Sequence, residues 1–242
     1  MRYYLISDIH GNLEALQAVL EDISKEKNGK YLCIGDLVGY GADAHAIIKK
    51  VRSLDPQVLI AGNHDWGAIG LLELDYFNEY AKAALLWTTK ILDKEELGYL
   101  ATFKLVYEET SFTMVHGSLN SPQNFYYIFS NNKAHDTMKL MNTPLCFVGH
   151  THIAGIFYSD KGKVLYTNGP KIRIDPNRKY VINVGSIGQP RDLDPRASYG
   201  IYDEEKAEVE IRRVRYDILE AQKKILDAGL PPYLASRLSE GI

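Results

Sequence analysis

The chain has 242 residues, of which 45% are hydrophobic and 24% are charged, and 28 Lys and Arg against 31 Asp and Glu give a net charge of −3. A disordered protein would have fewer apolar residues and more net charge, and a dedicated nucleic-acid-binding domain would be strongly basic. Neither description fits, so we expect a globular protein and no nucleic-acid partner. A chain of this size buries about 70–75% of its unfolded surface and needs no metal for stability alone.

The sequence also limits where the protein works. No apolar run approaches the roughly 18 residues of a membrane helix, and the N-terminal segment reaches Asp8 too soon for a signal peptide. We therefore expect a cytoplasmic protein with no membrane partner. Cys33 and Cys146 each lie in an apolar run, which favours buried free thiols over a disulfide.

The first part of the chain alternates strands and helices. Apolar residues recur with helical spacing over 13–23, behind a predicted N-cap at Asn12, and over 46–54. Short apolar runs predict buried strands on either side of these helices, at 3–7, 31–34 and 57–60. This order predicts right-handed crossovers and a parallel sheet.

The rest of the chain is first helical and then rich in strands. Helices are predicted over 76–92 and, from a capping box at 93–96, towards Phe103. A helix from Asp217 is predicted to end at Gly229. A hairpin at 104–107 and 111–115 and further strands are predicted at 145–148, 156–159, 163–166, 180–184, 198–202 and 208–214. We predict one domain, residues 1–242, with a helical cap-like insertion at about 66–108 and a C-terminal helical extension at about 217–242.

Polar residues follow five of the predicted strands where each strand ends. Five of the seven histidines lie there, whereas His45 and His135 fall in helical stretches and are expected to face solvent. Ligands of open α/β sheets bind beyond the carboxyl ends of the strands, so we expect these exits to converge on one crevice. The five exits read Asp8-Ile9-His10, Gly35-Asp36, Gly62-Asn63-His64-Asp65, His116-Gly117 and Gly149-His150-Thr151-His152.

Each motif alone has a simpler structural explanation. The Asp-x-His exit could be a hydrogen-bonded turn, Asp36 could cap a helix, and Gly62-Asn63 could form a turn because both residues tolerate positive φ. A His-x-His pair also occurs on surface strands by accident. The coincidence of all five motifs at strand exits is what favours a shared site.

The residue types at these exits predict a metal centre. Imidazole favours Mn, Fe, Zn, Co or Ni over Mg or Ca, and Mn is our first expectation. Two ions about 3.5–4 Å apart would clamp an in-line displacement at phosphorus and lower the pKa of a bridging water. Seven predicted ligands, too many for one tetrahedral ion, divide into Asp8, His10 and His152 for one ion and Asn63, His116 and His150 for the other, with Asp36 bridging.

His64 directly follows a predicted ligand, so its ring should lie beside the metals without coordinating them. It is predicted to protonate the leaving oxygen as a general acid, or alternatively only to orient Asn63. Asp65 could orient His64 or cap the next segment. Asn12 and Arg191 are predicted to contact the substrate.

The five blocks, which include Gly35-Asp36-Leu37-Val38-Gly39-Tyr40-Gly41, resemble in order and spacing those of the calcineurin-like metallophosphoesterase superfamily. The resemblance implies a four-layer αββα sandwich of two mixed β-sheets flanked by helices, with Asp36 bridging two metals and His64 as the catalytic histidine. Within the superfamily, the segment 184–192 resembles the Gly-Ser-x-Gly-Gln-Pro-Arg block of the small prokaryotic phosphoesterases typified by YfcE.

One departure from the superfamily concerns the phosphate. Gly39-Tyr40-Gly41 stands where the Ser/Thr protein phosphatases carry Asp-Arg-Gly, so the resemblance does not imply protein-phosphatase activity. Arg191 could supply the missing positive charge to a substrate phosphate, or it could form a surface salt bridge with Asp192 or Asp194.

The sequence thus predicts a dinuclear-metal-dependent phosphoesterase that cleaves small phosphomonoesters or phosphodiesters by in-line attack of a metal-bridging hydroxide. A dinucleoside polyphosphate hydrolase, acting for example on diadenosine tetraphosphate, is the narrower alternative. A non-catalytic metal-binding scaffold is disfavoured because all eight site positions are filled, and a nuclease is disfavoured by the net charge of −3. Exposed sheet edges leave a homo-oligomer open. Aromatic residues after the exits could stack on bases or pack in the core, namely Trp66, Tyr76, Phe125, Tyr126 and Tyr127.

Overall fold

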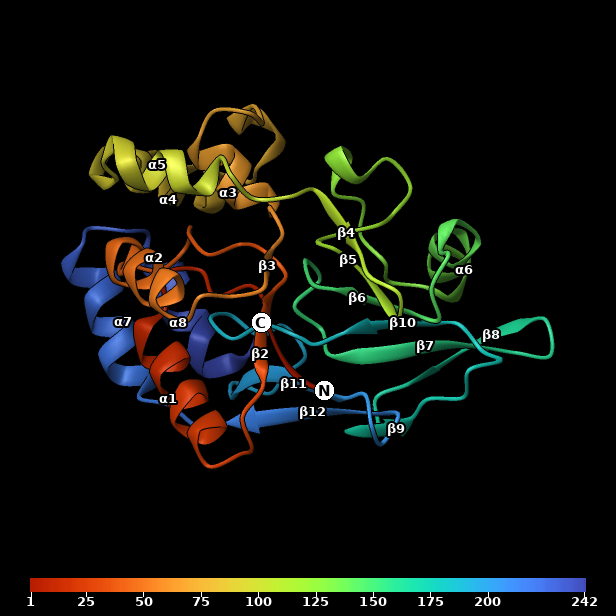
Figure 1. The fold of residues 1–242 in the computed structure, drawn as a ribbon. Coiled ribbons are helices and arrows are strands. Elements are labelled where there is room, and N and C mark those ends of the chain that lie inside the picture. The colour runs from red at the N-terminus through yellow and green to blue at the C-terminus, as the bar shows by residue number, and fades with distance from the viewer.

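The computed structural model describes residues 1–242 and contains two six-stranded mixed sheets (Figure 1). The first sheet has the order β3-β2-β1-β11-β12-β9. Its strands are β1 (Arg2–Ile6), β2 (Lys30–Cys33), β3 (Val58–Leu59), β9 (Lys171–Arg173), β11 (Ala197–Asp203) and β12 (Glu208–Val214). The second sheet has the order β4-β5-β6-β10-β7-β8. Its strands are β4 (Val106–Glu108), β5 (Phe112–Val115), β6 (Leu145–Val148), β7 (Gly155–Asp160), β8 (Lys163–Thr167) and β10 (Tyr180–Asn183).

Both sheets combine parallel and antiparallel pairs. In the first, β1, β2 and β3 are parallel, as predicted, and β11 and β12 complete the sheet in antiparallel register. In the second, β5, β6 and β10 are parallel, and the predicted hairpin of β4 with β5 is confirmed. All five polar exits therefore follow strands of the parallel parts of the sheets.

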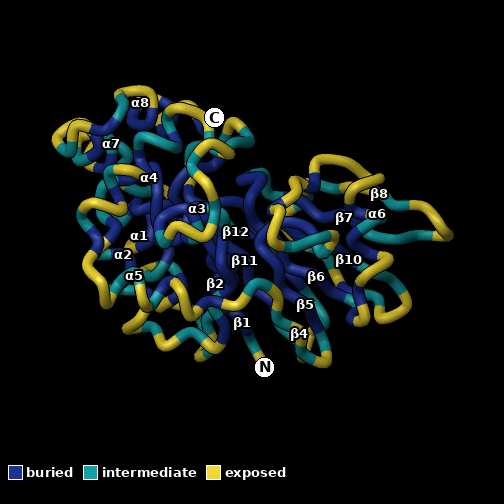
Figure 2. Tube along the Cα trace, turned by 90° about the horizontal axis from the view of Figure 1, so that it is seen from above, coloured by how far each residue is buried: buried dark blue, intermediate teal, exposed yellow.

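The period-2 alternation of the strands determines which side chains lie between the sheets. Tyr3 and Leu5 point into the core that the sheets share, whereas Tyr4 and Ile6 point to the outer helices. Figure 2 shows these buried strands in the middle of the molecule and exposed loops around the rim. Each sheet is thus buried on both faces, one against the other sheet and one against helices, as a four-layer fold requires.

Helices cover the outer faces of both sheets. The eight helices are α1 (Leu13–Ser24), α2 (Ala44–Ser53), α3 (Asn63–Ala68), α4 (Glu79–Ile91), α5 (Lys94–Leu100), α6 (Asn131–Leu140), α7 (Ile218–Asp227) and α8 (Pro232–Glu240). Helices α1 and α2 pack on the first sheet, and α6 packs on the second (Figure 1). The predicted αββα sandwich is confirmed. The longest helix, α4, has 13 residues, and none combines the length and apolarity of a membrane span.

The helices of the two segments predicted to be an insertion and a C-terminal extension pack against each other. Ala81 and Ala84 of α4 join Ile225 of α7 and Leu234 of α8 in one apolar cluster, which also contains Tyr40. Figure 1 shows the yellow insertion helices and the blue C-terminal helices on the same side of the first sheet. Two segments more than a hundred residues apart in the sequence therefore meet over Tyr40.

Several element boundaries differ from the predicted ones for local reasons. Helix α4 begins at Glu79 rather than 76, because the Asn78 side chain caps it by accepting the Ala81 N–H, at 3.0 Å. The sequence patterns do not predict α3 or β9, which are short. In the C-terminal extension, α8 follows α7 because Pro232 occupies a first helical position, where its missing N–H is not needed.

Candidate metal centre

The predicted ligands lie on loops that leave strands of both sheets. The loops after β1 and β2 carry Asp8, His10 and Asp36, and α3, which begins directly beyond β3, carries Asn63. The loops after β5 and β6 carry the remaining three predicted ligands, which are His116, His150 and His152. The five segments therefore converge on one site, as predicted, and both sheets contribute residues to it.

Five of the seven predicted ligands have backbones in the left-handed region. The φ angles are 51° at Asp8, 49° at His10, 53° at Asp36, 66° at His150 and 60° at His152. Such a conformation costs a non-glycine residue about 1–3 kcal/mol and concentrates at functional sites. The left-handed conformation reverses the local direction of the backbone, so that ligands two positions apart in one loop can face the same point.

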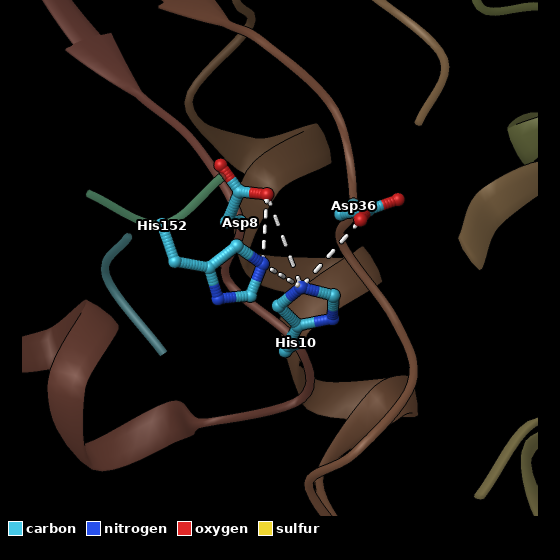
Figure 3. Close-up of side chains that lie close together, drawn as sticks. All are labelled: Asp8, His10, Asp36 and His152. Atoms are coloured by element: carbon cyan, nitrogen blue, oxygen red, sulfur yellow. Dashed lines mark hydrogen bonds and ion pairs between the residues drawn. The ribbon is translucent and has the colours of Figure 1, made fainter. Parts of the chain in front are cut away.

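The first group of potential ligands comprises Asp8, His10, Asp36 and His152, which are buried (Figure 3). His152 Nε2 lies 3.2 Å from Asp8 Oδ1, and His10 Nε2 lies 3.5 Å from Asp36 Oδ2. The two Nε2 atoms are themselves 3.1 Å apart. Four donor atoms thus surround one point within the span of a metal coordination sphere.

The second group shares Asp36 with the first and adds His116 and His150. His116 Nε2 lies 3.2 Å from Asp36 Oδ2. Asn63, the remaining predicted ligand, has a buried Oδ1 atom with no hydrogen-bond partner. Asp36 therefore lies between the two groups, in the position predicted for the bridging carboxylate.

Backbone carbonyls orient three of the imidazoles. The Nδ1 atoms of His10, His116 and His152 lie 3.0, 2.7 and 2.6 Å from the carbonyl oxygens of Val38, Ile34 and Gln189. Each Nδ1 donates to its carbonyl in the neutral tautomer, which leaves the lone pair on Nε2. Metal-bound histidines are held in this way, with the second nitrogen donating to a carbonyl or carboxylate.

Among the predicted ligands, three buried polar atoms accept or donate no hydrogen bond, namely Asp36 Oδ2, Asn63 Oδ1 and His116 Nε2, and the only approach among them is the ion pair of Asp36 with His116. Leaving such an atom unpaired costs about 1–3 kcal/mol, so buried polar atoms are almost always satisfied. The three atoms are an oxygen-and-nitrogen set that divalent ions accept. The residues present therefore fit divalent metal ions.

The charges of the centre support the same conclusion. Burial alone would raise the pKa of Asp8 and of Asp36, but the neighbouring imidazoles reverse the shift and hold both values well below the usual range. Burial opposes protonation of His116, but Asp36 outweighs it and raises the pKa of His116 to about 9. A metal ion that binds here would replace that proton.

His64 lies beside the two groups and belongs to neither. Its backbone N–H donates to Asp36 Oδ1 at 2.8 Å, and its ring centroid lies 4.7 Å from that of His10. A Cβ on Gly39 would lie 2.3 Å from His64 Nδ1, so only glycine fits there. Burial lowers the pKa of His64 to about 4, which makes the imidazole neutral near neutral pH.

Asp65 has a structural role that the sequence reveals only in part. Its carboxylate accepts the N–H groups of Asp36, Leu37 and Gly62, at 2.8, 2.9 and 3.0 Å. The bond from Gly62 is the predicted cap of the next segment, whereas no bond to His64 is formed. The other two bonds tie the loop after β2 to the loop after β3. In the sequence, the only indication of this role is an acidic residue three positions after the N-cap of a helix.

Arg191 lies against the centre without a carboxylate partner. Its guanidinium donates to the hydroxyl of Tyr40 at 3.1 Å and to Gln189 Oε1 at 3.0 and 3.1 Å. The positive charge of Arg191 contributes to lowering the pKa of His10 and of His152, behind the larger effect of burial. The backbone N–H of Arg191 donates to the carbonyl of the ligand His152 at 3.1 Å, and Tyr40, which its guanidinium contacts, packs on His10, so Arg191 lies beside the metal ligands.

The alternative of a surface salt bridge for Arg191 is wrong. Asp192 is bound instead by Arg213, and Asp194 is bound by Arg196. Both aspartates thus already have an arginine, and Arg191 is free of them.

Asn12 has a structural role. Its Oδ1 accepts the Ala15 N–H at 3.1 Å, which confirms it as the N-cap of α1, and its Nδ2 donates to the Gly188 carbonyl at 2.9 Å. Both ends of the buried amide thus hold the fold, and its contact with the substrate stays a prediction.

The residues outside the centre also lie as expected. His45 and His135 are exposed, and His45 pairs with Glu96 at 2.8 Å. Cys33 and Cys146 are buried free thiols, and they lie in separate apolar clusters between the outer helices and the two sheets.

Comparison with known proteins identifies the family. Residues 1–207 match the model of the calcineurin-like phosphoesterase superfamily domain. The chain belongs to this superfamily. It is therefore a hydrolase of phosphoester bonds, as the five sequence blocks predict.

Similar proteins extend over the whole chain. An uncharacterised protein of Methanocaldococcus jannaschii is 42% identical over 98% of this chain and 97% of its own length. The crystal structure of a metallophosphoesterase from Sphaerobacter thermophilus has a TM-score of 0.90 at 39% identity and covers 100% of this chain and 99% of its own.

Other similarities are partial or more distant. A symmetrical bis(5′-nucleosyl)-tetraphosphatase of Psychromonas ingrahamii is 33% identical over 51% of this chain and 46% of its own length, so that match spans about half of each protein. The YfcE phosphoesterase from E. coli, the type protein of the predicted group, has a TM-score of 0.46 at 15% identity over 89% of this chain and 100% of its own.

Proposed function

We propose that this superfamily member binds two divalent transition-metal ions, Mn before Fe, Zn, Co or Ni, and hydrolyses small phosphomonoesters or phosphodiesters. The observation that carries the proposal is two groups of buried potential ligands that share Asp36. Asp36 Oδ2 and His116 Nε2 in these groups, and Asn63 Oδ1 in addition, are buried without a hydrogen-bond partner. A single tetrahedral ion would leave several of these donors unused.

Each group of residues would hold one ion. Asp8, His10 and His152 would hold the first, and Asn63, His116 and His150 the second, with Asp36 contributing to both. When bound, two such ions neutralise charge on the phosphate and supply an attacking water at neutral pH. The carbonyl bonds from the Nδ1 atoms keep the imidazoles aimed at the ions throughout the reaction.

His64 donates a proton to the leaving oxygen in this proposal. Its ring lies beside both ligand groups, and the bond from its backbone to Asp36 fixes its distance from them. Its low pKa leaves the ring neutral in the free protein, and an anionic phosphate beside it favours the protonated form, which is the one that donates the proton. A general acid in this place contributes about 10²–10⁴-fold to the rate.

Arg191 binds a phosphate oxygen in this proposal. It replaces the arginine that is absent from Gly39-Tyr40-Gly41, and Tyr40, which stands at that position, holds its guanidinium. Gln189 holds the other edge. A guanidinium oriented by two neutral partners keeps its positive charge available for the substrate.

Metal analysis and turnover by the whole chain test the proposal. The substrate panel is p-nitrophenyl phosphate, bis-p-nitrophenyl phosphate, a cyclic nucleotide and diadenosine tetraphosphate, which represents the narrower polyphosphatase alternative. We expect two ions per chain, metal-dependent turnover of a mono- or diester, and its loss in His64→Ala but not in the exposed control His135→Ala. Absence of metal-dependent turnover on every substrate would overturn the proposal.

A further inference from the structure

A cavity lies beside His64 and extends away from the metal ligands, between the insertion and the loop after β5. Its volume is about 460 Å³, and its lining includes Asn63, His64 and His150. Sites for small organic ligands have volumes of about 300–1,000 Å³, so the cavity has room for the organic part of an ester. In the proposed function, on which this inference rests, the group that leaves is the one next to His64. The cavity is thus placed to receive that group.

The walls of the cavity are fixed to the histidines of the centre. On one side, the ring of Phe77 lies edge-on to His64 with centroids 5.1 Å apart. On the other side, Tyr127 stacks on His150 at 3.9 Å and 13°, and it also stacks on Phe129 at 5.0 Å. With two stacked neighbours, Tyr127 orients His150 rather than a ligand. The cavity is therefore preformed.

Two aromatic side chains of the lining are free to stack on a ligand. Tyr76, from the insertion, is 79% exposed, and Tyr126, from the loop after β5, is 48% exposed. Neither ring packs against another aromatic ring. A Cβ on Gly117 would lie 3.0 Å from the Tyr126 carbonyl oxygen, so this glycine lets the Tyr126 loop approach the end of β5. Exposed aromatic rings beside a reaction centre are suited to a flat ring system.

Beyond the two histidines of the centre and the tyrosine hydroxyls, the polar side chains of the cavity are amides, which carry no charge. Asn78, Gln123 and Asn124 line it, and no Asp, Glu, Lys or Arg does. A chain of several phosphates would lie along this lining without a counter-charge, which is costly away from water. A flat, uncharged group with hydrogen-bonding edges meets both the rings and the amides. Nucleobases have these properties and stack on aromatic side chains in many proteins.

We propose that this cavity binds the nucleoside part of the substrate, so that the enzyme cleaves esters in which a single phosphate is joined to a nucleoside. The base stacks on Tyr76 and Tyr126, and Gln123, whose amide has no partner in the protein, bonds its edge. The phosphate lies at the metal ligands with Arg191, and water replaces the nucleoside oxygen on phosphorus while that oxygen takes a proton from His64.

Binding of free nucleosides tests this assignment without relying on catalysis. Adenosine and uridine, which lack phosphate, are titrated into the whole chain with and without Mn, and saturation-transfer NMR measures the affinity. We expect at least adenosine to bind in both states, with about tenfold weaker affinity in Tyr126→Ala, the usual scale for loss of one stacking ring. Tyr126→Phe, which keeps the ring, should retain the affinity. Tyr166→Ala is the matched control, because Tyr166 is 46% exposed and lies outside the cavity.

The outcomes separate this inference from the proposed function. Failure of both nucleosides to bind, or equal affinities in Tyr126→Ala and Tyr166→Ala, would overturn the assignment of the cavity. Hydrolysis of p-nitrophenyl phosphate without nucleoside binding would overturn the cavity assignment alone. Nucleoside binding that depends on Tyr126, without metal-dependent hydrolysis of any ester, would support the cavity assignment and contradict the proposed function.

Discussion

The ligand-bearing loops and the appended helices differ in how their positions are encoded. In the loops, short segments with positive φ angles at Asp8, Asp36 and His150 turn polar side chains inward directly after buried strands. In the appended helices, position depends on contacts between α4, α7 and α8, which are far apart in the sequence. The loops therefore carry a local signal, whereas the helices are placed by packing alone. Tyr40, which contacts both regions, is where they meet.

This comparison predicts that changes in the loops alter metal binding and turnover, and that changes in the appended helices alter mainly stability. Metal removal should have the largest effect. A chelator should abolish turnover, and for each of the two ions it should lower the free energy of unfolding by about 2.7 kcal/mol relative to protein in a hundredfold excess of metal over its Kd, because the ions bind only the folded chain. For a chain of this length the melting temperature would fall by about 5–10 °C for each ion. Unchanged melting and turnover after verified metal removal would contradict the account.

His64→Ala should have the next largest effect. We expect kcat to fall by about 10²–10⁴-fold, because the proton donor is lost while the metal ligands stay in place. Steady-state kinetics with metal analysis checks this, and His135→Ala is the control because that histidine is exposed on α6. Loss of metal together with loss of activity would instead show that His64 acts by holding Asp36 or Asn63.

Asp65→Asn should have an intermediate effect. The amide places an N–H₂ group where the carboxylate accepts the N–H groups of Asp36, Leu37 and Gly62, so at least one of these bonds is lost. We expect metal affinity to fall by about 10–100-fold, the usual effect of losing a group that orients ligands. Isothermal titration with Mn measures the change. Wild-type affinity in a folded Asp65→Asn protein would mean that the two loops are held together by other contacts.

Tyr40→Phe should have a smaller effect, confined to the substrate. Arg191 loses the hydroxyl that orients it, and a hydrogen bond to a charged group contributes about 1.5–3 kcal/mol, so we expect KM to rise about tenfold with less change in kcat. Tyr199→Phe is the control, because its hydroxyl bonds to Asp22 on α1 and not to Arg191. An equal rise in KM in both variants would contradict the role of Tyr40.

Leu234→Ala should have the smallest effect on turnover. Leu234 is 1% exposed and packs between α8 and the other appended helices, so its truncation should destabilise the fold by about 2–5 kcal/mol. Denaturant unfolding measures this change, and kcat of the folded fraction should stay within about twofold, since Leu234 is none of the ligands and reaches their loops only through the cluster that it shares with Tyr40. A large fall in metal content would show that the two regions are less independent than the comparison holds.

Local patterns predict most of the fold and the ligand set. Apolar runs predict the central strands because burial on both faces needs such runs, and polar residues at their ends predict where the ligands gather. The capping box at Asp93 and the N-cap at Asn12 are predicted and confirmed, since each depends on residues three positions apart.

Long-range contacts explain what the sequence could not predict. That Tyr40 holds Arg191 depends on two loops separated by 151 residues. That Asp65 ties together the loops after β2 and β3 depends on their approach in space, and the appended helices show no sign in sequence that they pack on each other. The bond of Asn12 to Gly188, which spans 176 residues, is a further contact of this kind.

The central claim is that two ions share Asp36. Anomalous X-ray diffraction from crystals of the Mn-loaded chain tests it most directly. The account predicts two Mn peaks about 3.5–4 Å apart, with Asp36 between them, Asp8, His10 and His152 at one, and Asn63, His116 and His150 at the other. A single peak at full metal loading, or two peaks that do not share Asp36, would contradict it.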